Sequence, residues 1–300
     1  MKKRWGLFAA LACVCLLAVA SRPHSDVPLE LDDGLFSWGG AALAPENRTG
    51  LLDALERLDT GVLYQEFPPD SPEAVPFLAD MKTAGIQVWL LTGQAEWGLE
   101  PDGASLKSEI DRASALSAQS GGGLAGLMVD VEPYLTDQWD ADENRVLEQY
   151  VSCMAAARQY ARERKLALLA CIPYWYDNDH ADMLSRLVQT GCDGVAVMNY
   201  YRGREAEHIG TEVSLAREAG KPVICIYEFQ RPGIHDLTEE NTYYTAGLTA
   251  ARESWAAVRP AADYKSMSFA YHWYEPVLEL LGREDKTLFS ISRPSNQGND

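Results

Sequence analysis

The sequence predicts an α/β protein folded as a single (β/α)8 TIM barrel, and three observations support this prediction. Short apolar segments alternate with longer amphipathic segments eight times along most of the chain. The segment 125–131 is apolar on both faces, as expected of a strand buried between a barrel interior and a layer of helices. At 300 residues, of which 47% are hydrophobic, the chain is long enough to build one such domain.

The expected elements follow one another in a regular order. Strands are expected near 34–38, 61–66, 86–92, 125–131, 166–174, 193–200, 222–228 and 266–273. Helices are expected between them, near 47–58, 71–84, 104–119, 142–164, 178–190, 204–219 and 238–258, with a short one near 275–282. Several of these helices have recognisable ends. Pro72 stands in a first turn, and Gly85 and Gly220 each follow a last turn.

A doubly wound open sheet is the alternative fold. That fold usually carries a glycine-rich phosphate loop after its first strand. Here Trp38-Gly39-Gly40 does not match such a loop, and the three glycines at 121–123 precede a strand instead of following one. The barrel is therefore preferred, with residues 34–285 as one catalytic domain and no second domain.

The two ends of the chain are expected to lie outside the barrel. Residues 1–20 have the form of a secretory signal peptide, with positive charges at 2–4, an apolar run at 7–17 and a small-x-small cleavage site at 18–20. An uncleaved membrane anchor is the alternative, although the apolar run is short for a span. Residues 21–33 are expected to be a linker and 286–300 a flexible tail. These features predict a secreted, periplasmic or cell-surface protein without a stable membrane span after cleavage.

Charge and cysteine content limit the possible partners. The formal charge is −18 and becomes −21 once the signal peptide is removed, which argues against nucleic acid as a partner. Cys171 and Cys225 lie in apolar segments and are expected to be buried thiols, whereas a disulfide between Cys153 and Cys192 remains open. No pair of cysteines has zinc-site spacing, so no metal and no cofactor are predicted.

Aromatic, acidic and amide residues gather where the expected strands end. In a barrel of this class, these ends meet at one face and build the site. Aromatic rings mixed with carboxylates and amides suit a sugar, because its C–H faces stack on rings and its hydroxyls form hydrogen bonds. An oligosaccharide or polysaccharide is therefore the expected partner. The candidate substrate-binding residues are Trp38, Glu66, Trp97, Tyr134, Tyr174, Trp175, Asn199, Tyr227 and Trp273.

Two carboxylates close the fourth expected strand. Asp130 and Glu132 occupy alternate positions, so both point to the same face. Burying two such groups is costly, and glycoside hydrolysis needs a proton donor together with a second stabilising group. The two acids are therefore candidate catalytic residues. The alternative is a structural pair that arginine or backbone amides satisfy.

The segment Gly-Leu-Met-Val-Asp-Val-Glu at 126–132 resembles the strand-four motif of glycoside hydrolase family 18, which comprises the chitinase and endo-β-N-acetylglucosaminidase barrels. The resemblance assigns Glu132 to the catalytic acid and Asp130 to the acid that assists it. Met198-Asn199-Tyr200 resembles the strand-six motif whose tyrosine binds the acetamido group, and Trp273 resembles the tryptophan beneath the sugar. The resemblance implies a substrate-assisted retaining mechanism on glycans that contain N-acetylhexosamine.

The chain departs from this family at several positions. The two earlier acids of the strand-four motif are replaced by Ala125 and Met128, and Tyr201 stands where the family usually has Asp. These changes leave open a barrel that binds carbohydrate without turning it over.

A second resemblance, to clan A retaining glycosidases, rests on Glu132-Pro133 and on Glu228 near the end of strand seven. It implies Glu132 as acid/base and Glu228 as nucleophile, with Val131 in place of the usual Asn. A metal-dependent hydrolase is not favoured, because His180, His208, His235 and His272 are scattered. A serine hydrolase is not favoured either, because no Gly-x-Ser-x-Gly occurs.

Overall fold

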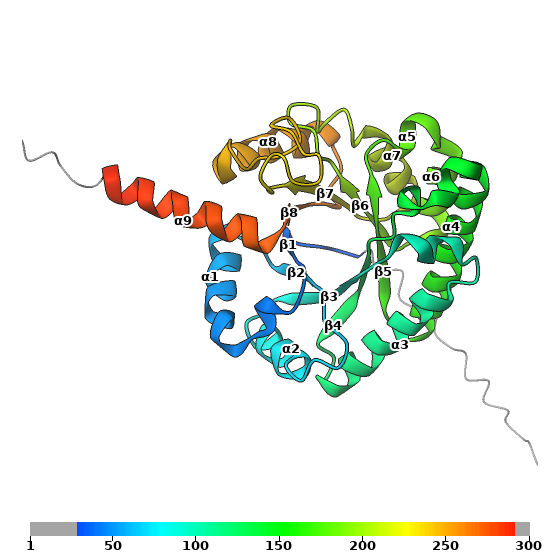
Figure 1. Cartoon of the computed structure of the whole chain (residues 1–300), viewed down its shortest axis with the longest axis horizontal. Helices are drawn as coiled ribbons and strands as arrows, with labels where there is room; N and C mark the ends of the chain where they lie inside the picture. Colours follow the sequence, from blue (N-terminus) through cyan, green and yellow to red (C-terminus); the bar gives the residue numbers. More distant parts are fainter. Residues whose placement is uncertain (1–28, 292–300) are drawn as a thin grey trace, which may run out of the picture.

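The computed structural model describes residues 29–291, and their side chains as far as residue 285. Eight parallel strands form a closed barrel in chain order, with β8 paired to β1, so the predicted fold class is confirmed (Figure 1). The strands are β1 (Gly34–Ser37), β2 (Val62–Gln65), β3 (Gln87–Thr92), β4 (Leu124–Val129), β5 (Ala167–Pro173), β6 (Gly194–Met198), β7 (Val223–Glu228) and β8 (Met267–His272).

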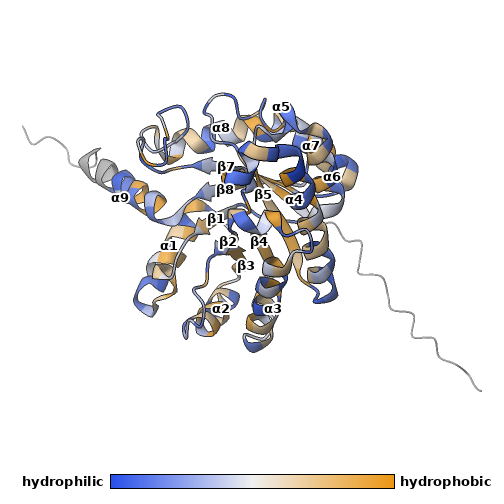
Figure 2. Ribbon diagram, turned by 45° about the vertical axis from the view of Figure 1, so that its right-hand side comes forward, coloured by the Kyte–Doolittle hydropathy of each residue, from blue (hydrophilic) through white to orange (hydrophobic). Residues whose placement is uncertain are grey.

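The helices surround the strands. They are α1 (Arg48–Leu58), α2 (Ala74–Thr83), α3 (Ala104–Gln119), α4 (Asp137–Glu163), α5 (Tyr176–Asp179), α6 (Ala181–Arg186), α7 (Gly210–Ala219), α8 (Gly247–Ala262) and α9 (Tyr274–Ile291). Figure 2 shows hydrophobic residues along the strands and hydrophilic residues on many of the outer turns. The alternation of segments in the sequence therefore reflects two apolar strand faces and one apolar helix face.

The helices expected at 238–258 and 178–190 differ from the structure. The helix expected at 238–258 begins only at Gly247, because the chain from 229 to 246 forms a long loop over the barrel mouth. The Thr242 hydroxyl fixes this loop, since it contacts the carbonyl oxygens of Glu228 and Gln230 at 3.2 and 2.7 Å. The helix expected at 178–190 is divided into α5, α6 and a short π-helical turn.

The two ends of the described chain both contact or adjoin the barrel. Residues 29–33 have no regular structure, but Leu29 and Leu31 pack against the cluster inside the barrel. The Asp33 carboxylate accepts a hydrogen bond from the backbone N–H of Phe269 at 2.7 Å. Helix α9 continues to Ile291, well past its expected end, and extends to one side of the barrel (Figure 1). The predicted signal peptide lies outside the described residues.

Apolar side chains fill the barrel interior below its C-terminal end. Tyr64, Trp89, Met128, Leu169 and Ile226 are among the buried residues of this inner cluster. A second, larger cluster lies between the strands and the helices. Because the interior is packed, open space for a ligand is left at the mouth of the barrel.

Gly126 permits this interior packing. A Cβ atom there would lie 2.2 Å from the Ala167 carbonyl oxygen and 2.6 Å from the Trp89 ring. We expect Gly126→Ala to lower the free energy of unfolding by about 1–3 kcal/mol, because the backbone atom cannot move aside. Gly282→Ala is the matched control. No atom lies within 4 Å of its added methyl group, so it should be neutral or stabilising. Urea unfolding followed by circular dichroism compares the two variants, and equal midpoints would contradict the expectation.

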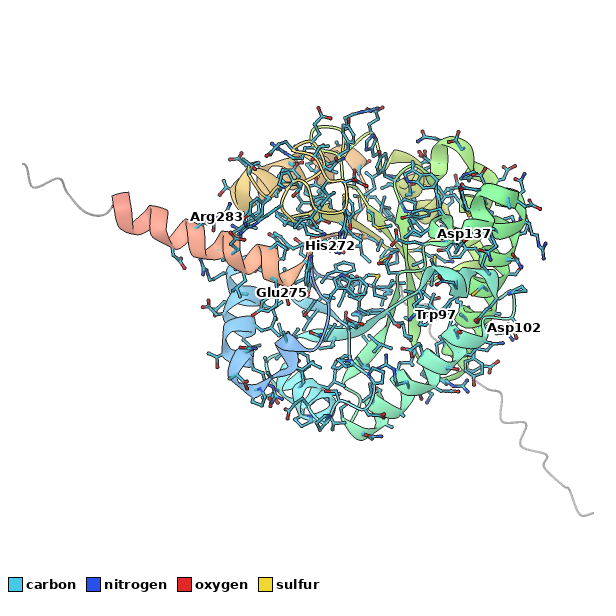
Figure 3. The ribbon with its side chains drawn as sticks, viewed as in Figure 1. Trp97, Asp102, Asp137, His272, Glu275 and Arg283 are labelled. Atoms are coloured by element: carbon cyan, nitrogen blue, oxygen red, sulfur yellow. The ribbon has the colours of Figure 1, made fainter. Side chains whose placement is uncertain are left out.

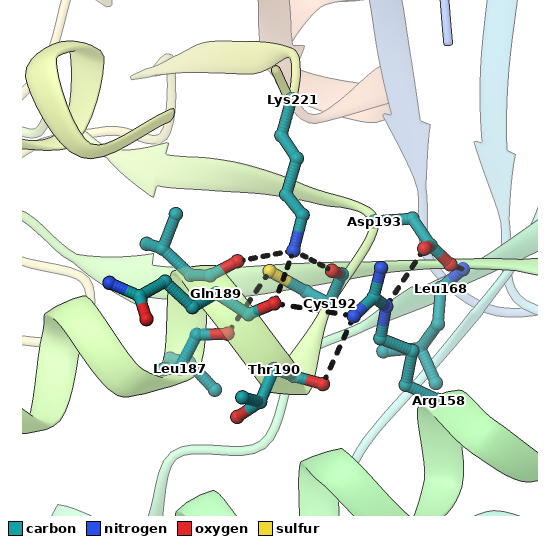
Figure 4. A network of polar contacts seen from close by, with 9 residues as sticks. Arg158, Leu168, Leu187, Gln189, Thr190, Cys192, Asp193 and Lys221 are labelled. Carbon is teal, nitrogen blue, oxygen red and sulfur yellow. Dashed lines mark hydrogen bonds and ion pairs between the residues drawn. The ribbon is translucent and has the colours of Figure 1, made fainter. Parts of the chain in front are cut away.

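A network of polar contacts joins the π-helical turn to Arg158 of α4 and to Lys221, which stands just before β7 (Figure 4). The Lys221 ammonium donates hydrogen bonds to the carbonyl oxygens of Val188, Gln189 and Cys192. These carbonyls stand where a helix ends, and a cation is favourable there.

All four cysteines among the described residues are buried free thiols. The burial expected for Cys171 and Cys225 is confirmed, and a disulfide between Cys153 and Cys192 is absent. Within the described part of the chain, no helix has both the length and the apolar content that a membrane span requires.

Candidate active site

A cavity of about 830 Å³ opens at the C-terminal end of the barrel. All four predicted catalytic residues line it: Asp130, Glu132, Tyr200 and Glu228. So do five of the predicted substrate-binding residues: Trp38, Tyr134, Tyr174, Trp175 and Trp273. In Figure 3, His272 lies near the middle of the ring of strands, and its ring also lines the cavity. Residues from six different strand ends therefore meet in one place.

Two predicted binding residues, Tyr227 and Asn199, point away from this cavity. The ring of Tyr227 stacks on Tyr243 with centroids 5.1 Å apart, and its hydroxyl contacts Ser254, in the layer between strands and helices. The Asn199 amide donates a hydrogen bond to the Glu205 carbonyl oxygen at 2.8 Å. The cause is strand alternation. Each of these residues immediately neighbours one that faces inward.

Glu66 and Trp97 also lie outside the cavity lining. The Glu66 carboxylate accepts a hydrogen bond from the backbone N–H of Gly39 at 2.5 Å, so it supports the loop that carries Trp38. Trp97 is partly buried and packs against the outer cluster. Both residues therefore have structural contacts in place of the predicted sugar contacts.

Glu132 stands at the end of a short extension of β4, next to aromatic rings. The Tyr134 hydroxyl donates a hydrogen bond to Glu132 Oε2. The Tyr134 ring packs edge-on against Trp175 and Tyr176, with centroids 5.2 and 6.2 Å away. Tyr134 thus holds the carboxyl group in a fixed position, a role that the sequence did not predict.

We expect Tyr134→Phe to lower kcat by about tenfold with little change in KM, because a hydrogen bond to a carboxyl group is lost while the ring stays. The measurement is steady-state kinetics on an oligosaccharide that the wild-type protein hydrolyses. Tyr160→Phe, which removes a hydroxyl that contacts Asp111 on the outer surface, is the control. An unchanged kcat for Tyr134→Phe would show that the contact with Glu132 does not position the acid.

Asp130 lies deeper in the cavity than Glu132. Its Oδ1 atom is buried and has no hydrogen-bond partner among the described residues. Burial and the nearby charge of Glu132 raise the pKa of Asp130 to about 7, although His272 acts in the opposite direction. Below it on the same strand face is Met128, whose sulfur lies 3.4 Å from that of Cys171. The surroundings therefore keep a substantial fraction of Asp130 protonated near neutral pH.

Glu228 is held by hydrogen bonds on both oxygens. Oε1 accepts the backbone N–H groups of Phe229 and Gln230 at 2.8 and 2.7 Å. Oε2 accepts the Gln230 side-chain amide at 3.1 Å and contacts His272 Nδ1 at 2.8 Å. Burial alone would raise the pKa of Glu228, but His272 and these hydrogen bonds lower it below its usual value. A carboxylate satisfied in this way is poorly disposed to act as the nucleophile of a clan A mechanism.

Several residues of the lining were not selected from the sequence. Gln230 stands two positions after Glu228, so strand alternation was an available signal for it. His235, Asp236 and Leu237 reach the cavity from the loop after β7, just before the helix expected at 238–258. Among residues 29–285, no three His, Cys, Asp or Glu side chains come together in a way that could hold a metal ion.

Comparison with known proteins gives a clear result for the fold. No family model and no curated protein matches the chain. A GH18 chitinase from Pseudoalteromonas aurantia matches in structure with a TM-score of 0.53 at 11% identity, over 84% of this chain and 99% of that chain. A GH18 chitinase variant from Cycas revoluta, in complex with (GlcNAc)4, matches with a TM-score of 0.54 at 13% identity, over 86% and 99% of the two chains.

The likeness is not confined to chitinases. A putative α-L-fucosidase from Bacteroides thetaiotaomicron matches with a TM-score of 0.57 at 10% identity, over 97% of this chain and 100% of that chain. At these identities the comparison establishes the architecture, and the chemistry has to be argued from the site. The chain is a single (β/α)8 barrel that resembles the glycoside hydrolase family 18 barrels in fold.

Proposed function

We propose that this protein is a retaining glycoside hydrolase that acts on glycans containing N-acetylhexosamine. The observation that carries the proposal is the placement of Glu132. Its carboxyl group lines the cavity beside Asp130, and Tyr200 and Trp273 line the same space. The cavity therefore combines aromatic faces on which a sugar ring can stack with a carboxyl group that can give up a proton. The (GlcNAc)4 complex of the structurally similar Cycas chitinase supports the substrate class.

In the proposed mechanism the substrate supplies its own nucleophile. Glu132 gives its proton to the leaving oxygen while the acetamido oxygen of the sugar attacks the anomeric carbon. Asp130 accepts a hydrogen bond from the acetamido N–H and stabilises the positive charge that develops, and the Tyr200 hydroxyl holds the acetamido oxygen. Glu132 then takes a proton from the water that opens the cyclic intermediate, so its proton is restored and the configuration is retained. In this scheme Glu228 holds the His272 ring in place and does not act as a nucleophile.

The test is a substrate screen with the wild-type protein. N-acetylglucosamine oligosaccharides should be hydrolysed, whereas glucose oligosaccharides of the same length should not, because they lack the acetamido group. An N-acetylglucosamine thiazoline should inhibit. Hydrolysis of both series without thiazoline inhibition would instead support the clan A mechanism.

Binding of the N-acetylated series without any turnover would support the alternative of a carbohydrate-binding barrel. This alternative is favoured by one observation, the replacement of two motif acids by Ala125 and Met128. Calorimetric titration with the same oligosaccharides measures binding independently of hydrolysis and so separates the two cases.

We also propose that the protein is exported through residues 1–20. The positive residues at 2–4 and the apolar run at 7–17 support this proposal. The mature protein would then begin at Ser21. N-terminal sequencing of protein recovered from outside the cytoplasm tests this, and an intact Met1 would contradict cleavage.

A further inference from the structure

Asp130 has few groups near it that could set its charge. Its Oδ1 atom has no hydrogen-bond partner among residues 29–285. Met128, the residue beneath it on the same strand face, carries a thioether and no ionisable group. Asp130 lines the same cavity as Glu132, on its own segment, and His272, and the charges of both neighbours act on Asp130.

His272 is fixed between two partners. Its Nδ1 lies 2.8 Å from Glu228 Oε2, and the indole N–H of Trp38 donates to its Nε2 at 3.1 Å. An indole N–H can only donate, so Nε2 is the acceptor and Nδ1 carries the proton that is donated to Glu228. The histidine side chain is 15% exposed and that of Glu228 is 2% exposed. The ring is thus nearly buried, and its tautomer is set by Glu228 at the end of β7 and by Trp38 just after β1.

This arrangement allows a second state. A proton added at Nε2 would replace the bond from Trp38 and would give a cation facing the cavity, with Glu228 still bound at Nδ1. Four groups face the ring: Glu228 from β7, Asp130 and Glu132 from the end of β4, and Tyr200 from the end of β6, whose ring centroid is 5.8 Å away. Three of them are acids. Burial lowers the pKa of His272, but these acids, Glu228 above all, raise it beyond its usual value.

We propose that His272, held between Glu228 and Trp38, is a positioning residue that sets the charge of Asp130. When Asp130 ionises, a proton on His272 Nε2 balances the new negative charge across the cavity. When Asp130 is protonated, His272 returns to the neutral form that accepts from Trp38. The coupling works in both directions, as two interacting titrating groups require. Its catalytic consequence rests on the proposed function, but the coupling itself does not.

The first experiment measures the coupling without any substrate. Side-chain ¹⁵N NMR of histidine distinguishes the neutral Nδ1–H tautomer from the cation, and His272→Asn identifies the signal. In Asp130→Asn the titration midpoint of His272 should fall by about one pH unit, because a negative neighbour is lost. His208 lies outside the cavity lining and serves as an internal control whose midpoint should not move. An unchanged His272 midpoint would overturn the proposal.

The second experiment follows the pH dependence of kcat/KM. His272→Asn keeps an N–H donor for Glu228 but cannot become a cation. The acidic limb of the profile of kcat/KM against pH should therefore move to higher pH by about one unit, because Asp130 loses the group that lowers its pKa. His208→Asn should leave the limb in place. A uniform loss of activity with an unmoved limb would show a merely structural role and would overturn the proposal. If no oligosaccharide is hydrolysed, the proposed function fails, while the NMR result still decides the coupling.

Discussion

Glu132→Gln should lower the turnover of N-acetylglucosamine oligosaccharides by about 10²–10⁴-fold, the usual contribution of a general acid. The amide fills the same volume and can still contact the Tyr134 hydroxyl, but it has no proton to give to a leaving oxygen. Because the aromatic lining is unchanged, the dissociation constant for the oligosaccharide should stay within a few-fold of the wild-type value. The measurements are single-turnover hydrolysis and calorimetric binding with the same ligand.

A matched control uses Glu96→Gln. Glu96 is an exposed acid after β3 that does not line the cavity, so this variant should keep wild-type turnover. Equal turnover by Glu132→Gln and the wild type would remove Glu132 from the mechanism. A comparable loss in Glu228→Gln, together with rescue of the smaller variant Glu228→Ala by azide, would transfer the nucleophilic role to Glu228. Without rescue, a loss in Glu228→Gln is the effect expected of an anchor for His272.

The fold could be predicted because each strand has an unusual property in the sequence. Segments such as 125–131 are short and apolar on both faces, a pattern typical of a strand covered on both sides. Asp130 and Glu132 follow directly from this assignment, since polar residues at the end of such a strand must reach the barrel mouth. Both of them line the cavity. Local pattern and global fold agree in this part of the chain.

The positions of Asn199 and Tyr227 outside the cavity lining have a physical cause that the sequence already contains. Consecutive residues of a strand point to opposite faces, so Tyr200 and Asn199 cannot both face the cavity, nor can Glu228 and Tyr227. Because Tyr200 and Glu228 face the cavity, Asn199 and Tyr227 face the layer of helices.

The loop after β7 could not be predicted in the same way. Residues 238–246 have local features of a helix start, but the Thr242 hydroxyl contacts the backbone of Glu228 and Gln230. These contacts exist only once the barrel has formed, and they hold the chain over its mouth. The contributions of His235 and Asp236 to the cavity depend on this tertiary arrangement. Long-range hydrogen bonds therefore determine this part of the site, and the hydrophobic periodicity of the sequence does not predict it.

Asp130→Asn should stabilise the protein at alkaline pH and at the same time lower its activity. The pKa of Asp130 is about 7 in the folded chain, against 3.8 as its ordinary value. Between about pH 4 and pH 7 the folded state thus binds more protons than the unfolded state, so stability falls as pH rises through this range. Asparagine cannot ionise and avoids that loss. At pH 8 the variant should exceed the wild type by about 1–4 kcal/mol in free energy of unfolding, whereas at pH 4 the difference should vanish.

Urea unfolding at pH 4, 6 and 8 measures this dependence, with Asp102→Asn as a control at an exposed position outside the cavity. The control should show no pH-dependent difference from the wild type. A stability difference that is the same at all three pH values would mean that Asp130 does not hold an unfavourable charge. The activity of Asp130→Asn should fall in the same samples, since a neutral amide cannot stabilise the positive charge on the sugar. Opposite changes in stability and turnover are the pattern expected of a buried acid that is retained for its chemistry, because a structural acid would lose stability when it is replaced.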